Sequence, residues 1–106
     1  MANILVNAPK SVKKGEAFEV KTLISHVMET GFRAGTNGRS IPRNIIEEFI
    51  ATYNGAEVFR MKMSPAVAAN PFVAFHMAVK ESGKLALRWT GDEGFSAENS
   101  IAIAVE

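Results

Sequence analysis

Two histidines, His26 and His76, are the side chains of this sequence best suited to bind a metal ion or to transfer a proton. A metal site in a protein needs at least three ligands, and neither histidine has carboxylates near it at a recognisable ligand spacing. The chain contains no cysteine, so it has no thiolate nucleophile, no disulfide and no sulfur ligand for zinc or iron. We therefore predict no metal site and no cofactor.

Serines and carboxylates offer two further catalytic arrangements. A triad could combine Ser25 or Ser64 with a histidine and Asp92, but neither serine lies within a nucleophile elbow. Glu47 and Glu48 are adjacent, so on a strand they point to opposite faces and cannot act on one substrate. No glycine-rich loop has the spacing that binds phosphate. The sequence predicts no catalytic residue and no enzyme, and an unrecognised hydrolase is the least favoured alternative.

Arginines gather in one stretch of the chain. Residues 27–40 are rich in glycine and predict a loop without regular structure, which contains Arg33 and Arg39, with Arg43 just beyond it. A cluster of guanidinium groups could bind an oxyanion or an acidic partner, because their forked donors match such groups. The arginines could equally be solvent-exposed charges that keep the loop soluble, and both interpretations remain open here.

Composition limits the class of protein. With 106 residues, 47% of them hydrophobic and 22% charged, residues 1–106 are expected to form a single soluble domain. A formal net charge of +1 and the absence of a block of like charge argue against nucleic acid as a partner. No apolar run approaches the length of a membrane span, and the first ten residues, MANILVNAPK, do not resemble a signal peptide. Any export would then need help from another protein.

Alternation of apolar and polar residues predicts the elements that would position these side chains. It recurs in short runs separated by turn signals, a pattern typical of an all-β, immunoglobulin-like antiparallel β-sandwich of about seven strands. The runs are residues 3–8, 18–26, 44–53, 56–63, 72–80, 85–89 and 101–105.

The third of these runs also fits a helix, because its apolar residues recur at helical spacing. The pair Asn54-Gly55 favours a strand, since both residues tolerate the positive φ angles of a two-residue hairpin turn. Such a turn would place Tyr53 opposite Ala56, Ile50 opposite Phe59 and Glu47 opposite Lys62.

Several segments taken together resemble the SoxZ family, the non-catalytic subunit of the SoxYZ sulfur carrier in thiosulfate oxidation. Two residues depart from the pattern expected for the family: Val27, within HVMETG, stands where proline is expected, and Phe32, directly after it, stands where a polar residue is commoner. The segments are VKKGEAFEVKTLISH (12–26), HVMETG (26–31), IPRNII (41–46), YNGAEVF (53–59), SPAVAANPFVAF (64–75) and SGKLALRWTGDEG (82–94).

The resemblance implies an immunoglobulin-like fold and a heterodimer with SoxY, whose C-terminal Gly-Gly-Cys-Gly-Gly tail carries the sulfur intermediate. This chain lacks cysteine and ends in an expected strand, so we expect it to be the scaffold subunit, in transient contact with other Sox enzymes. The resemblance also implies a periplasmic location, reached by export together with a partner that bears the signal. A free-standing binding module for a small oxyanion or glycan is the alternative.

Residues for such a partner interface are sought among apolar side chains that the core does not need and among the loop arginines. On this basis we expect that replacing both Met28 and Phe32 with aspartate weakens the heterodimer without unfolding the domain. The full set of candidates is Met28, Phe32, Arg33, Arg39, Arg43, Val67 and Phe72.

Overall fold

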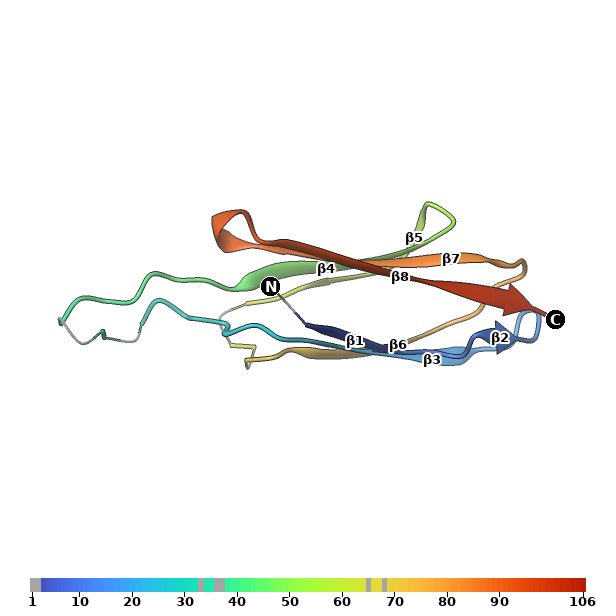
Figure 1. The fold of residues 1–106 in the computed structure, drawn as a ribbon, viewed down its shortest axis with the longest axis horizontal. Coiled ribbons are helices and arrows are strands. Elements are labelled where there is room, and N and C mark those ends of the chain that lie inside the picture. The colour runs from blue at the N-terminus through green and yellow to red at the C-terminus, as the bar shows by residue number, and fades with distance from the viewer. Residues whose placement is uncertain (1–2, 33, 36–37, 65, 68) are drawn as a thin grey trace.

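The computed structural model is a β-sandwich, and it describes residues 3–32, 34–35, 38–64, 66–67 and 69–106 (Figure 1). The strands are β1 (Ile4–Asn7), β2 (Ser11–Val12), β3 (Phe18–Ile24), β4 (Ile46–Tyr53), β5 (Ala56–Lys62), β6 (Phe72–Met77), β7 (Gly83–Gly91) and β8 (Ser96–Val105), and a 3-10 turn, η1 (Asp92–Gly94), joins the last two. The small sheet has the order β1-β3-β6 and the large sheet the order β2-β8-β7-β4-β5. This arrangement confirms the predicted immunoglobulin-like sandwich.

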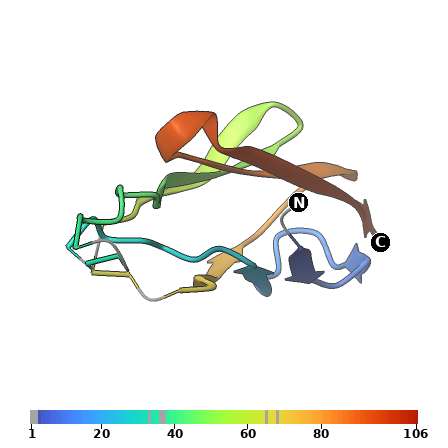
Figure 2. The same ribbon diagram turned by 60° about the vertical axis from the view of Figure 1, so that its left-hand side comes forward.

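The two sheets lie face to face (Figure 2), and alternation along their strands builds the core between them. In β3, Val20, Thr22 and Ile24 are fully buried, while Lys21 and Leu23 between them face outward. From the large sheet, Phe49 and Trp89 meet with ring centroids 4.9 Å apart, and both side chains are fully buried. The described residues contain no helix that is long and apolar enough to cross a membrane.

The Asn54-Gly55 turn joins β4 and β5, so residues 46–53 form a strand and the helical alternative is wrong. Both turn residues have positive φ angles, 50° and 85°, as the sequence predicts. The Tyr53–Ala56 pair is also confirmed.

The rest of the predicted hairpin register is wrong by one residue. Phe59 lies opposite Ala51 rather than Ile50, and Lys62 lies opposite Glu48 rather than Glu47. The shift falls between Ala51 and Thr52, where Val58 is an extra residue on β5 and forms a β-bulge. Without the bulge Arg60 would lie opposite the buried Phe49, so burial of apolar residues on both strands requires it.

A short strand that the sequence does not predict closes one edge of the large sheet. Residues 11–12, within an expected turn, form β2 and pair in parallel with β8, so the described residues form eight strands and the sandwich is not wholly antiparallel. The Ala104 N–H donates to the Lys10 carbonyl at 2.9 Å, and the Glu106 N–H donates to the Val12 carbonyl at 2.9 Å. Val12 is buried beneath this pairing.

The chain between β3 and β4, residues 25–45, extends beyond the sandwich as a long arm, which we call the arm (Figure 1). Its described residues form no strand, only two isolated bridges, Glu29 with Asn44 and Ala34 with Ser40, which confirms the predicted loop. The molecule is consequently elongated, with extents of 58 × 21 × 19 Å.

Candidate partner-binding site

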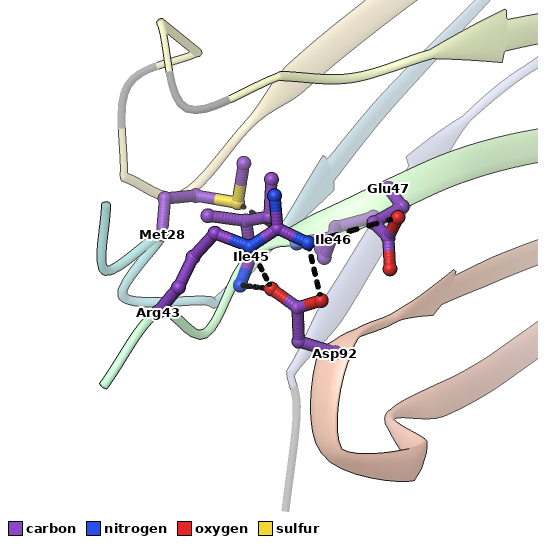
Figure 3. A network of polar contacts seen from close by, with 6 residues as sticks. All are labelled: Met28, Arg43, Ile45, Ile46, Glu47 and Asp92. Carbon is purple, nitrogen blue, oxygen red and sulfur yellow. Dashed lines mark hydrogen bonds and ion pairs between the residues drawn. The ribbon is translucent and has the colours of Figure 1, made fainter. Parts of the chain in front are cut away.

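An ion pair fastens the base of the arm to the turn between β7 and β8 (Figure 3). The Arg43 guanidinium donates from Nε to Oδ2 of Asp92 and from Nη2 to Oδ1, both at 2.8 Å. The Asp92 Oδ2 also accepts the backbone N–H of Ile45 at 3.1 Å, and Glu47 lies 3.9 Å from Arg43 Nη2. This bidentate pair fixes where the arm joins β4.

The same contacts determine the charges at the arm's base. The hydrogen bonds from Arg43 hold the pKa of Asp92 below its ordinary value, with support from the Ile45 N–H. The Asp92 carboxylate in turn raises the pKa of Arg43. The guanidinium of Arg43 is therefore already occupied by a carboxylate, which removes it from the predicted arginine cluster for an oxyanion or for the rim of an interface.

Met28 belongs to the core, contrary to the premise on which it was selected for a partner interface. Its side chain is 5% exposed, and its sulfur accepts the backbone N–H of Ile46 at 3.3 Å (Figure 3). At the base of the arm, Glu29 on the segment that leaves β3 and Asn44 on the segment that returns to β4 exchange two backbone hydrogen bonds of 2.8 Å. An aspartate at position 28 would place a charge in this core, so it would unfold the domain rather than test a surface.

His26 stabilises the first residues of the arm. Its Nδ1 accepts the Met28 N–H at 3.0 Å, and its own backbone N–H donates to Asn70 Oδ1 at 2.9 Å. The ring packs edge-on against Phe95, with centroids 4.7 Å apart. Partial burial lowers the pKa of His26, and the nearby Asp92 carboxylate opposes this effect.

The remaining candidate residues lie in different places. Phe32 is 88% exposed on the arm and Arg39 is exposed farther along it, whereas Val67 packs partly buried against the core. Phe72 is 61% exposed and begins β6 on the outer face of the small sheet. Arg33 lies outside the described residues. The arm and the outer face of the small sheet are therefore separate candidate surfaces, and a partner for either remains a prediction.

Three residues with evident roles in these surfaces were not among the candidates. Asp92 was considered for a catalytic triad and instead holds the arm. Leu5 and Leu23 share the outer face of the small sheet with Phe72. The alternation in β1 and β3 places them there, and it is the signal that could have found them.

Metal binding finds no support in the described part of the chain. No three histidine, aspartate or glutamate side chains within residues 3–32, 34–35, 38–64, 66–67 and 69–106 come close enough to hold an ion. His76 lies on the outer face of the small sheet, where its Nε2 is 4.0 Å from a Glu19 oxygen.

Comparison with known proteins establishes the family. The family model described as sulphur oxidation protein SoxZ matches residues 6–102, nearly the whole chain. The chain belongs to the SoxZ family. It is therefore a subunit of the Sox sulfur-oxidation carrier complex, and SoxZ is the non-catalytic subunit of that complex. No curated protein matches the sequence.

Solved structures share the fold of this SoxZ-family chain at low sequence identity. A superoxide reductase (neelaredoxin) variant from Ignicoccus hospitalis is 22% identical with a TM-score of 0.78, over 97% of this chain and 79% of that one. The sulfur carrier protein SoxY from Chlorobium limicola is 14% identical with a TM-score of 0.66, over 97% and 78%. These likenesses concern the sandwich alone, so the reductase activity of the first says nothing about this chain.

Proposed function

We propose that this chain is the scaffold subunit that pairs with a SoxY-type protein whose C-terminal Gly-Gly-Cys-Gly-Gly tail carries the sulfur intermediate. The match to the SoxZ family over residues 6–102 is the observation that supports this most directly. The 106 residues contain no thiol, so a sulfur atom held covalently on cysteine would have to be held by a second chain. In this proposal the complex presents the bound sulfur to other Sox enzymes.

Two features of the structure suit a scaffold. The sandwich has a continuous core between two sheets, which gives a partner a fixed surface to bind. The arm carries an aromatic side chain, Phe32, that is 88% exposed, and exposed aromatic residues often become anchors when a partner buries them. We assign the arm to transient contacts with Sox enzymes.

Co-purification with a SoxY-type protein bearing the cysteine tail tests the pairing. We expect a stable one-to-one complex in size-exclusion chromatography and, after exposure to a sulfur donor, a mass increase on the partner alone. A partner with its tail cysteine replaced by serine is the control, and it should form the complex but not the adduct. Failure of the two purified chains to associate would contradict the proposal.

The periplasmic location is a separate proposal, based on export together with a signal-bearing partner. Deleting the partner's signal peptide should retain both subunits in the cytoplasm, as measured by cell fractionation and immunoblotting. Unchanged export of this chain would show that it reaches the periplasm by itself or by another route.

A further inference from the structure

An apolar row crosses the outer face of the small sheet. Leu5 on β1 lies directly opposite Leu23 on β3, and Leu23 lies directly opposite Phe72 on β6. Leu5 is 66% exposed, Phe72 is 61% exposed and Leu23 is half-buried between them. Opposed side chains on neighbouring strands are about 5 Å apart at Cβ, so the three form one continuous surface.

The row is bordered by two hollows in the protein surface. One has a volume of about 290 Å³ and is lined on this face by the row together with Asn7 and Lys21. The other, of about 140 Å³, is lined by Leu5 and Leu23 with Asn3, Ser25 and Asn70. Protruding side chains of a docked protein could enter both hollows, while the polar groups around them, including the charged Lys21, would form the rim.

The large sheet offers an internal comparison, because its outer face has the opposite character. There, too, four residues on neighbouring strands lie directly opposite one another. They are Arg60 on β5, Ile50 on β4, Arg88 on β7 and Glu98 on β8. Arg60 pairs with Glu48 at 2.7 Å, and Arg88 Nε lies 3.7 Å from Glu98. Ion pairs of this kind suit a surface that stays in water, whereas the centres of interfaces are poor in charge.

Most large exposed apolar side chains lie on the small sheet or on the arm. Among the described residues five large hydrophobic side chains are exposed: Leu5, Val27, Phe32, Val58 and Phe72. Two lie in the row, two lie on the arm that β3 leads into, and only Val58 lies on the large sheet. The row and the arm are therefore the two places where exposed apolar side chains offer a surface for binding.

The exposed area fits the centre of a protein interface. A phenylalanine buries about 150–250 Å² when it is fully covered, so covering the exposed part of Phe72 removes on the order of 100 Å² from water. A standard interface takes about 800 Å² from each partner. The row supplies the apolar centre of such an interface, and the polar residues around the hollows supply the rest.

We propose that the outer face of the small sheet, centred on Leu5, Leu23 and Phe72, is the surface that docks the SoxY-type subunit. This inference rests on the proposed function and adds the place of contact. SoxY from Chlorobium limicola has the same sandwich fold, so it too has flat sheet faces, and two such faces can pack over a broad area. The apolar row would then lie at the centre of the heterodimer.

Two aspartate substitutions test the surface in the full-length chain. Leu5→Asp and Phe72→Asp each place a charge in the row, and each should raise the Kd for the SoxY-type partner by about 30-fold or more, the loss expected at a binding hot spot. Val58→Asp is the matched control, because Val58 is 42% exposed on the opposite sheet, and it should leave the Kd unchanged. Thermal unfolding of the three variants checks that the fold is retained.

Hydroxyl-radical footprinting tests the same surface without a substitution. In the wild-type complex Leu5, Leu23 and Phe72 should be protected from oxidation while Val58 remains reactive. If the wild-type chains associate but the row stays reactive, or the aspartate variants bind like the control, this inference is overturned and the proposed function stands. If the wild-type chains do not associate, the proposed function itself fails. If the row is already protected in the isolated chain and adding the partner does not change this protection, the face binds a second copy of this chain and the inference is overturned.

Discussion

Asp92 acts as the fixed point of the arm, because its two carboxylate oxygens accept hydrogen bonds from Arg43 and from the Ile45 backbone. The ion pairs of Glu48 with Arg60 and of Glu98 with Arg88 lie along the large sheet and hold no loop in place. The surface ion pair between Arg88 and Glu98, for example, is longer and joins two strands that already share backbone hydrogen bonds. The two pairs should therefore differ in their effect on stability.

Replacing Asp92 with asparagine should lower the midpoint of urea unfolding at pH 7 more than replacing Glu98 with glutamine does. The pKa of Asp92 is lowered in the folded state, chiefly by Arg43, so its contribution is present above the ordinary value of 3.8 and is lost as the pH falls below it. The difference between wild type and Asp92→Asn should then shrink as the pH is lowered through this range. A constant difference down to pH 2 would show that the charge of Asp92 is not what holds the arm.

His26 should make the base of the arm sensitive to mildly acidic pH. Burial lowers its pKa below the ordinary 6.5, so the unfolded chain binds the proton more readily than the folded chain. The stability contributed by neutral His26 is present above pH 6.5 and is lost as the pH falls through its folded-state pKa. Protonation would also prevent Nδ1 from accepting the Met28 N–H.

We expect the urea midpoint of the wild type to decrease between pH 7 and pH 5, and His26→Gln to show a smaller decrease. The control is His76→Gln, which changes the exposed histidine on β6 and should keep the pH dependence of the wild type. Equal slopes for the wild type and both variants would rule out His26 as the source.

At the scale of elements, the hairpin of β4 and β5 depends on the bulge at Val58. The bulge lets Phe59 and Met61 face the core opposite Ala51 and Phe49, although the two-residue turn alone would place them on the outer face. The stacked rings of Phe59 and Phe75, 4.7 Å apart, then join β5 to the small sheet. The bulge thus accommodates one extra, exposed residue without turning the apolar face of β5 away from the core.

Deleting Val58 removes the extra residue and gives the two-residue hairpin a regular register, in which Phe59 stays opposite Ala51 and Met61 stays opposite Phe49. Both side chains remain in the core, so the free energy of unfolding should fall by less than about 3 kcal/mol. Val58→Thr keeps the extra residue and should change the free energy of unfolding by less than about 0.5 kcal/mol. Urea unfolding followed by the fluorescence of Trp89 measures both. A loss of more than about 3 kcal/mol in the deletion variant would show that β4 and β5 cannot pair in this register without the bulge.

Alternation and turn chemistry predict most of the sandwich, since strands with a buried face have a period of two and Asn54-Gly55 marks the hairpin. They do not predict the bulge, because a single extra residue on one strand leaves the pattern of each strand intact. The strand β2 is missed because two residues are too few to show a period. The Arg43–Asp92 pair joins residues 49 positions apart, so no local pattern reveals it.

Among the predicted site residues, the distinction between core and surface is the weak point. Met28 stands in a glycine-rich segment that predicts an exposed loop, yet tertiary contacts bury it. Leu5 and Leu23 follow the alternation of a strand, but a period of two identifies the two faces without telling which of them another element covers. Only the pairing of three strands shows that both leucines meet Phe72.

At the scale of the whole molecule, the arm makes the protein unusually extended. The radius of gyration is 16.2 Å, against about 13 Å for a compact domain of this length. Beyond the bridge between Glu29 and Asn44, the described residues of the arm contribute no buried side chain. The arm and the sandwich should therefore be separable in stability.

Replacing residues 31–41 with a short Gly-Ser linker should reduce the radius of gyration toward that of a compact domain, as measured by small-angle X-ray scattering. The melting temperature should stay within about 4 °C of the wild type, the shift that corresponds to at most about 1 kcal/mol for a domain of this size. The shortened chain should still bind the SoxY-type partner if the small sheet docks it. A large drop in melting temperature would show that the arm belongs to the folding unit.

The pairing of β2 with β8 has a consequence for how the protein is made. In the large sheet β8 lies between β2, near the start of the chain, and β7. That sheet therefore cannot be completed until β8, the final strand, has been synthesised. Translation at about 5–20 residues per second then leaves the apolar faces of the earlier strands uncovered for seconds. Nascent chains would be most exposed to aggregation in that interval, when a chaperone or a subunit already folded nearby would be of greatest use.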